Sequence, residues 1–131
     1  MFRLSILAVL LIISPSASRA DDPKPKVIPA TEANDHLDKP CIVEMTVRLS
    51  KNAEPRKEFY LDSEEDFHDP KNVAVVISYD ALDAFKKAGI DDPSKHYLSK
   101  KIRVEGTPKR EAQQVRMRIT DPKFITVVDS K

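Results

Sequence analysis

The stretch KKIRVEGTPKREAQQVRMRI, residues 100–119, contains two alternating segments on either side of a bend. In residues 101–105 and again in residues 115–119, apolar and charged side chains take turns, which is typical of half-buried strands. The phrase GTP between them has the glycine and proline of a turn. We therefore predict two neighbouring strands with their apolar side chains inward and arginines outward. The outward arginines are Arg103, Arg116 and Arg118.

The same reasoning predicts further strands upstream and at the end of the chain. Apolar residues occupy the odd positions from Cys41 to Leu49, and EFYL at 58–61 alternates again after the polar turn SKNAEPRK. The continuous β-branched run VAVVIS at 73–78 indicates a more deeply buried strand. The last strand is long and interrupted: its final part, FITVV at 124–128, follows an Asp-Pro turn.

Two short helices are expected between these strands. Thr31 is placed to cap a helix that ends at Leu37. After VAVVIS the period changes, and we expect a second helix with Asp80 at its N-cap and Gly89 at its left-handed end. The polar segments DSEEDFHDPKN and DDPSKHY are expected to be loops.

The order of elements predicts the fold class. Three strands, a helix and two strands follow one another, and five short antiparallel strands cannot bury both faces of a flat sheet. We expect an all-β protein with one or two short helices, closed into a small five-stranded barrel. The helix between strands three and four would cover one end of the barrel.

The first twenty residues have the layout of a cleavable secretory signal. Arg3 precedes an apolar run from Leu4 to Ile13, and small residues occupy positions 18 and 20. The run is too short for the roughly 20 residues that a membrane span needs, which disfavours an uncleaved anchor. We expect cleavage near Ala20 and a periplasmic or secreted product with no transmembrane segment. The predicted organisation is a signal at 1–20, a Pro-rich extended leader at 21–30 and one domain at 31–131.

Charge and cysteine content limit the classes of function. The chain has 22 Lys and Arg against 21 Asp and Glu, and removing Arg3 and Arg19 leaves 20 against 21. A balance so close to zero does not indicate a polyanion binder, so any such function must depend on a local patch. The single cysteine, Cys41, excludes an intramolecular disulfide and is interpreted as a small buried hydrophobe.

No cofactor or metal site is expected. The acidic segment from Asp62 to Asp69 lacks the spacing and the glycine of an EF-hand loop, so a solvated loop is the favoured interpretation over a cation site. The histidines His36, His68 and His96 have no metal-ligand spacing. No nucleophile stands beside a base, so we expect a non-enzymatic protein, with a nuclease-like enzyme as the weaker alternative.

Three phrases resemble small exported bacterial proteins of the OB-fold (oligonucleotide/oligosaccharide-binding) family. They are EANDHLDKPCIVEMTV, YLSKKIRVEGTP and MRITDPKFITVV, and the match that they mark spans residues 32–128. Asp38 and Ser99 stand where the family pattern prefers glycine in a left-handed turn, and Met45 stands at its bulge glycine. The resemblance implies a five-stranded OB-fold Greek-key barrel with its helix between strands three and four.

The resemblance also implies where a ligand would bind. In this fold the outer face of strands two and three binds ligands, flanked by the loops between strands one and two and between strands four and five. Both loops carry basic residues, and one aromatic residue points outward on strand two. These candidate ligand-binding residues are Lys51, Arg56, Lys57, Tyr60, Lys109 and Arg110.

Two functions remain open from the sequence. The first is a binding module that holds an anionic polymer, such as single-stranded nucleic acid or a polysaccharide, between the two basic loops. The second is an extracytoplasmic module that docks a protein or a neutral glycan, as the near-zero charge and the few stacking aromatics indicate. Ordinary solvated surface charge is the alternative to a site at the basic loops. The oligomeric state is left open.

Overall fold

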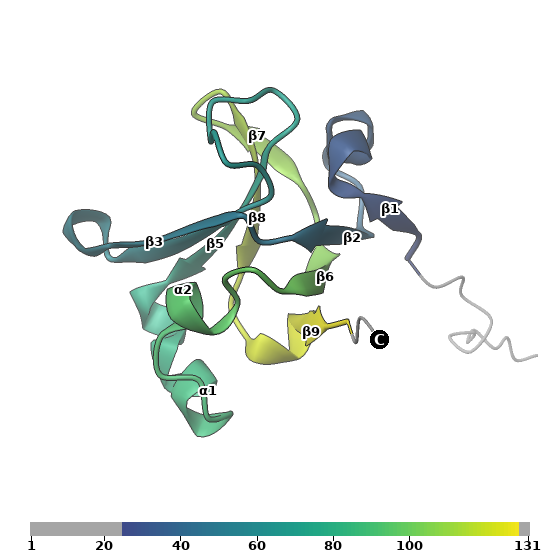
Figure 1. The fold of residues 1–131 in the computed structure, drawn as a ribbon. Helices are drawn as coiled ribbons and strands as arrows, with labels where there is room; N and C mark the ends of the chain where they lie inside the picture. The colour runs from purple at the N-terminus through teal and green to yellow at the C-terminus, as the bar shows by residue number, and fades with distance from the viewer. Residues whose placement is uncertain (1–24, 129–131) are drawn as a thin grey trace, which may run out of the picture.

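Residues 25–128, the part that the computed structural model describes, contain two β-sheets joined by bent strands (Figure 1). The first sheet has the order β1-β2-β6-β9 and the second the order β3-β4-β5-β8-β7. The first comprises β1 (Val27–Pro29), β2 (Cys41–Thr46), β6 (Lys101–Gly106) and β9 (Ile125–Val127). The second comprises β3 (Leu49–Ala53), β4 (Glu58–Asp62), β5 (Val73–Ser78), β7 (Lys109–Glu111) and β8 (Gln114–Ile119).

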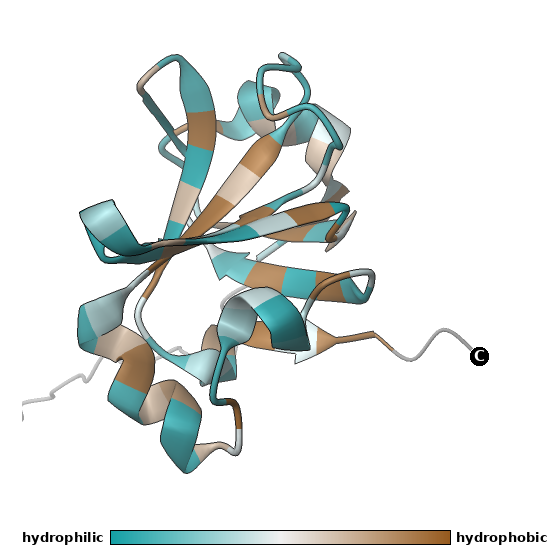
Figure 2. Ribbon diagram, turned by 60° about the vertical axis from the view of Figure 1, so that its left-hand side comes forward, coloured by the Kyte–Doolittle hydropathy of each residue, from teal (hydrophilic) through white to brown (hydrophobic). Residues whose placement is uncertain are grey.

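The alternation read from the sequence is what builds the core. Apolar and polar bands alternate along the strands (Figure 2), and the odd positions of β2 and β8 are buried. Val73–Ser78 is buried at five successive positions, as its continuous apolar run predicted. Full burial of such a side chain contributes about 1.5–3 kcal/mol. The largest fully buried side chains include Leu61, Phe85, Tyr97, Ile102 and Met117.

The strand expected over residues 41–49 divides at Val47. The Val47 N–H donates to the carbonyl of Lys100 at 2.9 Å, whereas the Arg48 N–H donates to the carbonyl of Asp62 at 2.9 Å. These two adjacent residues therefore bond to different sheets, because successive backbone groups of an extended chain point to opposite sides. The polar segment SKNA, expected as a turn, continues the strand as β3.

The expectation of a closed barrel is corrected by the structure. The connections follow the predicted order, but the hydrogen bonds form two sheets and no closed barrel among the described residues. A second bend explains this, because Pro108 separates β6 from β7 and has no N–H to continue the ladder. The expectation that all strands run antiparallel is also wrong, since β5 and β8 pair in parallel.

The helices differ from the expectations at their starts. The first is a 3₁₀ helix, η2 (Ala30–His36), with Pro29 and no side-chain bond at its N-cap, so the predicted Thr31 cap is wrong. The second region begins with η4 (Tyr79–Ala81) and continues as α1 (Leu82–Lys87). Its cap is Ser78, whose hydroxyl accepts the Asp80 N–H at 3.1 Å. A two-residue shift in the cap, from Asp80 to Ser78, thus separates prediction from structure.

Two segments expected as irregular contain short helices. In DDPSKHY, the Asp92 carboxylate accepts the Ser94 N–H at 2.9 Å and starts α2 (Pro93–His96). The remaining 3₁₀ turns, η3 (Glu54–Arg56) and η5 (Pro122–Phe124), each have proline at a first helical position. None of the helices in residues 25–128 is long and apolar enough to cross a membrane.

Several local expectations are confirmed. Asp38, Ser99 and Gly89 have φ values of 65°, 70° and 86°, in the left-handed region predicted for them. Cys41 is buried, and that burial raises the pKa of its thiol.

The N-terminal expectations are met only in part by what the structure describes. The signal at residues 1–20 and the start of the leader lie outside the described residues, and the cleavage site stays a prediction. The end of the leader is part of the domain, because β1 pairs in parallel with β2.

Candidate functional site

The outer face of the second sheet carries two cross-strand rows of side chains. In one row Lys51 pairs with Tyr60 and, through Val76, reaches Arg118. In the other row Asp62 and Arg116 flank Ala74. Because side chains directly opposite on neighbouring strands share a face, these rows place three cationic residues and one tyrosine on one surface.

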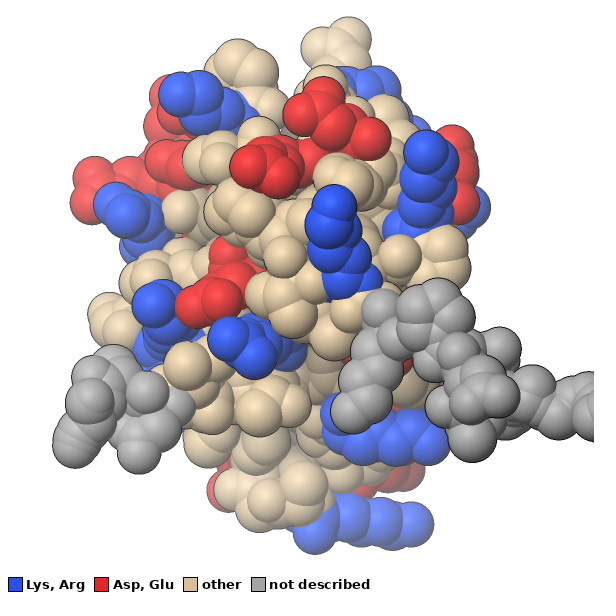
Figure 3. Space-filling model, turned by 90° about the vertical axis from the view of Figure 1, so that its right-hand side faces the viewer, with Lys and Arg blue, Asp and Glu red and all other residues tan. Residues whose placement is uncertain are grey.

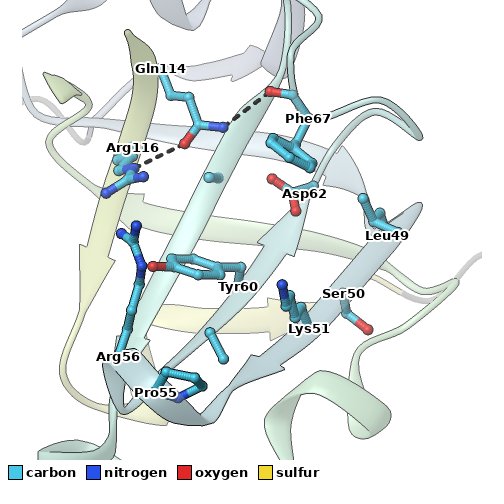
Figure 4. A pocket seen from close by; sticks show the side chains of 12 residues that line it. Leu49, Ser50, Lys51, Pro55, Arg56, Tyr60, Asp62, Phe67, Gln114 and Arg116 are labelled. Carbon is cyan, nitrogen blue, oxygen red and sulfur yellow. Dashed lines mark hydrogen bonds between the residues drawn. The ribbon is translucent and has the colours of Figure 1, made fainter. Parts of the chain in front are cut away.

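A pocket of about 500 Å³ opens on this surface (Figure 4). It lies between the β3–β4 hairpin, the loop that follows β4, and β8. The small Ala74 is among its lining residues, and the larger side chains stand around it. The charged and aromatic lining residues are Lys51, Arg56, Tyr60, Asp62, Phe67 and Arg116.

The structure brings three of the six predicted site residues together. Lys51, Arg56 and Tyr60 line this one pocket. Lys57 is exposed beside it, at the left-handed end of η3 with φ of 57°, and is not among the lining residues. The segment predicted as the first basic loop therefore borders a concave surface.

The other two predicted residues lie elsewhere. Lys109 and Arg110 belong to β7 rather than to a loop. Lys109 Nζ lies 3.3 Å from Asp38 Oδ1, and the Arg110 guanidinium donates to the Asn34 amide oxygen. Both side chains thus contact η2 and the turn after it. The expected cleft between two basic loops is corrected to a pocket between the first loop and β8.

Arg116 was not predicted as a site residue, although its outward orientation was. Its Nε donates to Gln114 Oε1 at 3.0 Å, and its guanidinium carbon lies 5.7 Å from the centroid of the Tyr60 ring. Gln114 Nε2 donates to the Phe67 carbonyl at 3.0 Å. This chain of contacts fixes the loop after β4 against β8 and holds a cation beside an aromatic face.

Arg118, by contrast, is neutralised within the sheet. Its guanidinium donates to both carboxylate oxygens of Glu111, at 2.7 and 3.2 Å, and to Glu58 at 3.1 Å. The Tyr60 hydroxyl donates to Glu58 at 2.6 Å. That hydroxyl, and after it Arg118, lowers the pKa of Glu58. Glu58 therefore anchors the Tyr60 ring at the pocket.

Phe67 is the aromatic residue that the sequence did not reveal. It lies in the acidic segment interpreted as a solvated loop, and it is 46% exposed at the pocket. The acidic residues near it bind their own backbone: Asp66 accepts the His68 N–H and Asp69 accepts the Lys71 N–H, at 2.9 and 2.8 Å. Within residues 25–128, no group of three or more His, Cys, Asp or Glu residues is arranged to hold a metal ion.

Asp62 is the one acidic residue of the pocket, and it is only 5% exposed. The Asn72 amide donates to its Oδ1 at 2.8 Å. Burial raises the pKa of Asp62, and the bond from Asn72 and the charge of Arg116 only partly oppose this. The folded protein therefore holds this carboxylate less favourably than water does.

This predicts that Asp62→Asn stabilises the protein at neutral pH. The folded pKa of Asp62 lies above its unfolded value, so stability from this group is highest when it is protonated and falls as pH rises from the unfolded to the folded pKa. The Asp62→Asn variant has no ionisable group at this position, so it does not lose this stability as pH rises. Thermal melting across pH should show a higher midpoint for Asp62→Asn at pH 7 and a shrinking difference in acid. A lower midpoint at pH 7 would contradict this account.

The side of the molecule near β1 differs from the pocket face. Positive and negative side chains are interspersed on it (Figure 3). On the first sheet, Lys101 and Arg103 both pair with Glu44, at 3.3 and 3.4 Å. Arg103, the third outward arginine, is thus paired away from the pocket.

Comparisons with known proteins identify the fold. No protein-family model matches the chain, and no curated protein matches it. A solved structure described as an aspartyl-tRNA synthetase from Leishmania major Friedlin matches 90% of this chain with a TM-score of 0.53 at 12% identity. Entamoeba histolytica asparaginyl-tRNA synthetase, in complex with asparaginyl-adenylate, matches 82% with a TM-score of 0.50 at 13% identity.

The likeness is confined to the fold. The chain covers 23% and 25% of the lengths of these two synthetases. At such low identity the match shows architecture alone. The protein is mostly β with short helices and OB-fold-like, in agreement with the family resemblance read from the sequence.

Proposed function

We propose that this protein is a binding module for single-stranded nucleic acid, which it holds in the pocket of the second sheet. The observation that carries the proposal is that cationic and aromatic side chains line the same pocket. Three cations, from Lys51, Arg56 and Arg116, surround two aromatic rings, from Tyr60 and Phe67, in one open cavity. Cations bind phosphates and exposed rings stack bases, and proteins that bind single strands combine the two.

Charge within the pocket supports an anionic ligand although the whole chain is nearly neutral. Lys51 and Arg56 are exposed, and no salt bridge of 4.0 Å or less involves either of them within the described part of the chain. Arg116 lies 3.9 Å from Glu111, a loose pair compared with the 2.7 Å contact of Arg118. Two cations without a salt bridge and one loosely paired cation therefore line the pocket.

The fold gives independent support. OB-folds bind oligonucleotides on this face of the sheet. The two synthetases with matching structures act, by their names, on tRNA, so domains of this fold occur in proteins that handle RNA. The pocket's position follows from the strand order, whereas its chemistry follows from the side chains named above.

Binding should be measurable by fluorescence anisotropy with a labelled uridine RNA of about eight nucleotides, within the range that one OB-fold covers. Three phosphate contacts would give a slope of roughly −2 in a plot of log affinity against log salt concentration, because each contact releases about 0.7 counterions from a single strand. Binding that is absent at low salt, or independent of salt, would contradict the proposal.

A further inference from the structure

Asp62 and Arg116 stand in one cross-strand row with Ala74 between them. Neighbouring strands lie about 4.8 Å apart, so the backbones of the two charged residues are separated by about 10 Å. In the part of the chain that the structure describes, no lysine or arginine nitrogen lies within 4.0 Å of the Asp62 carboxylate. The Asp62 carboxylate, an acceptor, and the Arg116 guanidinium, a donor, thus lie on either side of the Ala74 methyl group.

The acceptor is held in place by neighbours. Asn72 Nδ2 donates to Asp62 Oδ1, while Asn72 Oδ1, the side-chain amide oxygen, accepts the Glu64 N–H at 2.9 Å. The Ser63 hydroxyl accepts the Val73 N–H at 2.9 Å. These bonds orient the carboxylate on the end of β4. In Figure 4 it lies on the side of the pocket opposite Arg116.

A buried carboxylate without a cationic partner costs folding energy. Two of the pocket's other residues, Tyr60 and Phe67, are rings that suit a flat ligand. A planar group lying over Ala74 would satisfy both charges if one of its edges donates hydrogen bonds and another accepts them. The pocket therefore specifies the hydrogen-bonding pattern of its ligand.

Guanine has this pattern. Its N1–H and 2-amino groups donate from one edge, and a carboxylate can accept both. Its O6 and N7 accept from another edge, and arginine is their usual bidentate donor. Adenine carries its amino donor beside its N7 acceptor, and uracil carries one N–H between two carbonyls. Building on the function proposed above, we propose that the pocket selects guanine, with Asp62 reading its donor edge and Arg116 its acceptor edge.

The ligand side of the test leaves the protein unchanged. Labelled uridine RNAs of about eight nucleotides would carry one central guanosine, adenosine, inosine or 7-deazaguanosine. We expect the guanosine RNA to bind at least about fivefold more tightly than the adenosine RNA, as for a good bidentate contact. Inosine lacks the 2-amino donor and 7-deazaguanosine lacks the N7 acceptor, so both should lose part of that preference.

The protein side identifies the residue. Asp62→Asn should reduce the preference for guanosine over adenosine to about onefold. The affinity for the adenosine RNA should rise, because a negative charge is lost from the pocket. Asp66→Asn, on an exposed carboxylate of the loop after β4, removes the same charge and should keep the preference. Retention of the preference by Asp62→Asn would overturn the assignment.

The outcomes separate the two proposals. Equal, salt-dependent binding of the guanosine and adenosine RNAs would overturn guanine selection and leave the nucleic-acid function standing. Failure of all four RNAs to bind at low salt would overturn both. Because the modified bases test the contact in the unaltered protein, the result does not depend on whether the Asp62 variant folds.

Discussion

Reversing the charge of Arg56 and Arg116 together should weaken binding of a single-stranded RNA by about a hundredfold or more. Each charge-assisted hydrogen bond contributes about 1.5–3 kcal/mol, and 1.4 kcal/mol is tenfold in affinity. Both residues line the pocket, Arg56 from η3 and Arg116 from within β8. Anisotropy titrations of Arg56→Glu/Arg116→Glu should also show a shallower salt dependence, because the phosphate contact of Arg56 is lost.

The matched control is Lys109→Glu/Arg110→Glu, which changes the net charge by the same amount. These residues lie on the edge strand β7, contact Asp38 and Asn34, and are not among the residues that line the pocket. Its effect on binding should be several times smaller, limited to the long-range field of the protein. If the two double variants weaken binding equally, the pocket assignment is wrong and net charge governs the affinity.

Phe85→Ala should cost about 3–5 kcal/mol of the free energy of unfolding, the range for large aromatic residues in a core. Phe85 is fully buried and is the buried residue of α1. A helix of six residues has no stability of its own in water, so its packing depends on this side chain. Urea denaturation followed by circular dichroism would measure the loss. A change below about 1 kcal/mol would show that α1 contributes little to the core.

Phe67→Ala is the natural counterpart, since it removes the same ring from an exposed position. Its effect on stability should stay within about 0.5 kcal/mol. Its effect on RNA binding should be about 1–3 kcal/mol, the contribution of one stacked base. The two phenylalanine variants therefore separate damage to the fold from damage to the site.

Local pattern was enough to locate most strands. β5 was predicted at its observed bounds, and β4, β6 and β8 within a residue. The family resemblance put a bulge in the first strand at Met45, but the residue pattern gave no sign of the division at Val47, because both halves keep the same alternation and no glycine or proline marks the break. The bend depends on which sheet each backbone N–H bonds to, and those partners are distant along the chain.

The site was only partly predictable for a related reason. Lys51, Arg56 and Tyr60 are close in sequence and were identified together. Arg116 joins them through the parallel pairing of β5 with β8, which depends on contacts far apart along the chain. The exposure of Phe67 in an acidic loop had no local signal either.

The switch at Val47 has a mechanical consequence. Since β2 runs directly into β3, the strand that borders the pocket cannot detach without disturbing its continuation in the first sheet. A ligand that binds only the folded protein lowers the frequency of such opening. Occupancy of the pocket should therefore slow amide hydrogen exchange along β2 as well as β3, in a sheet that the ligand never touches.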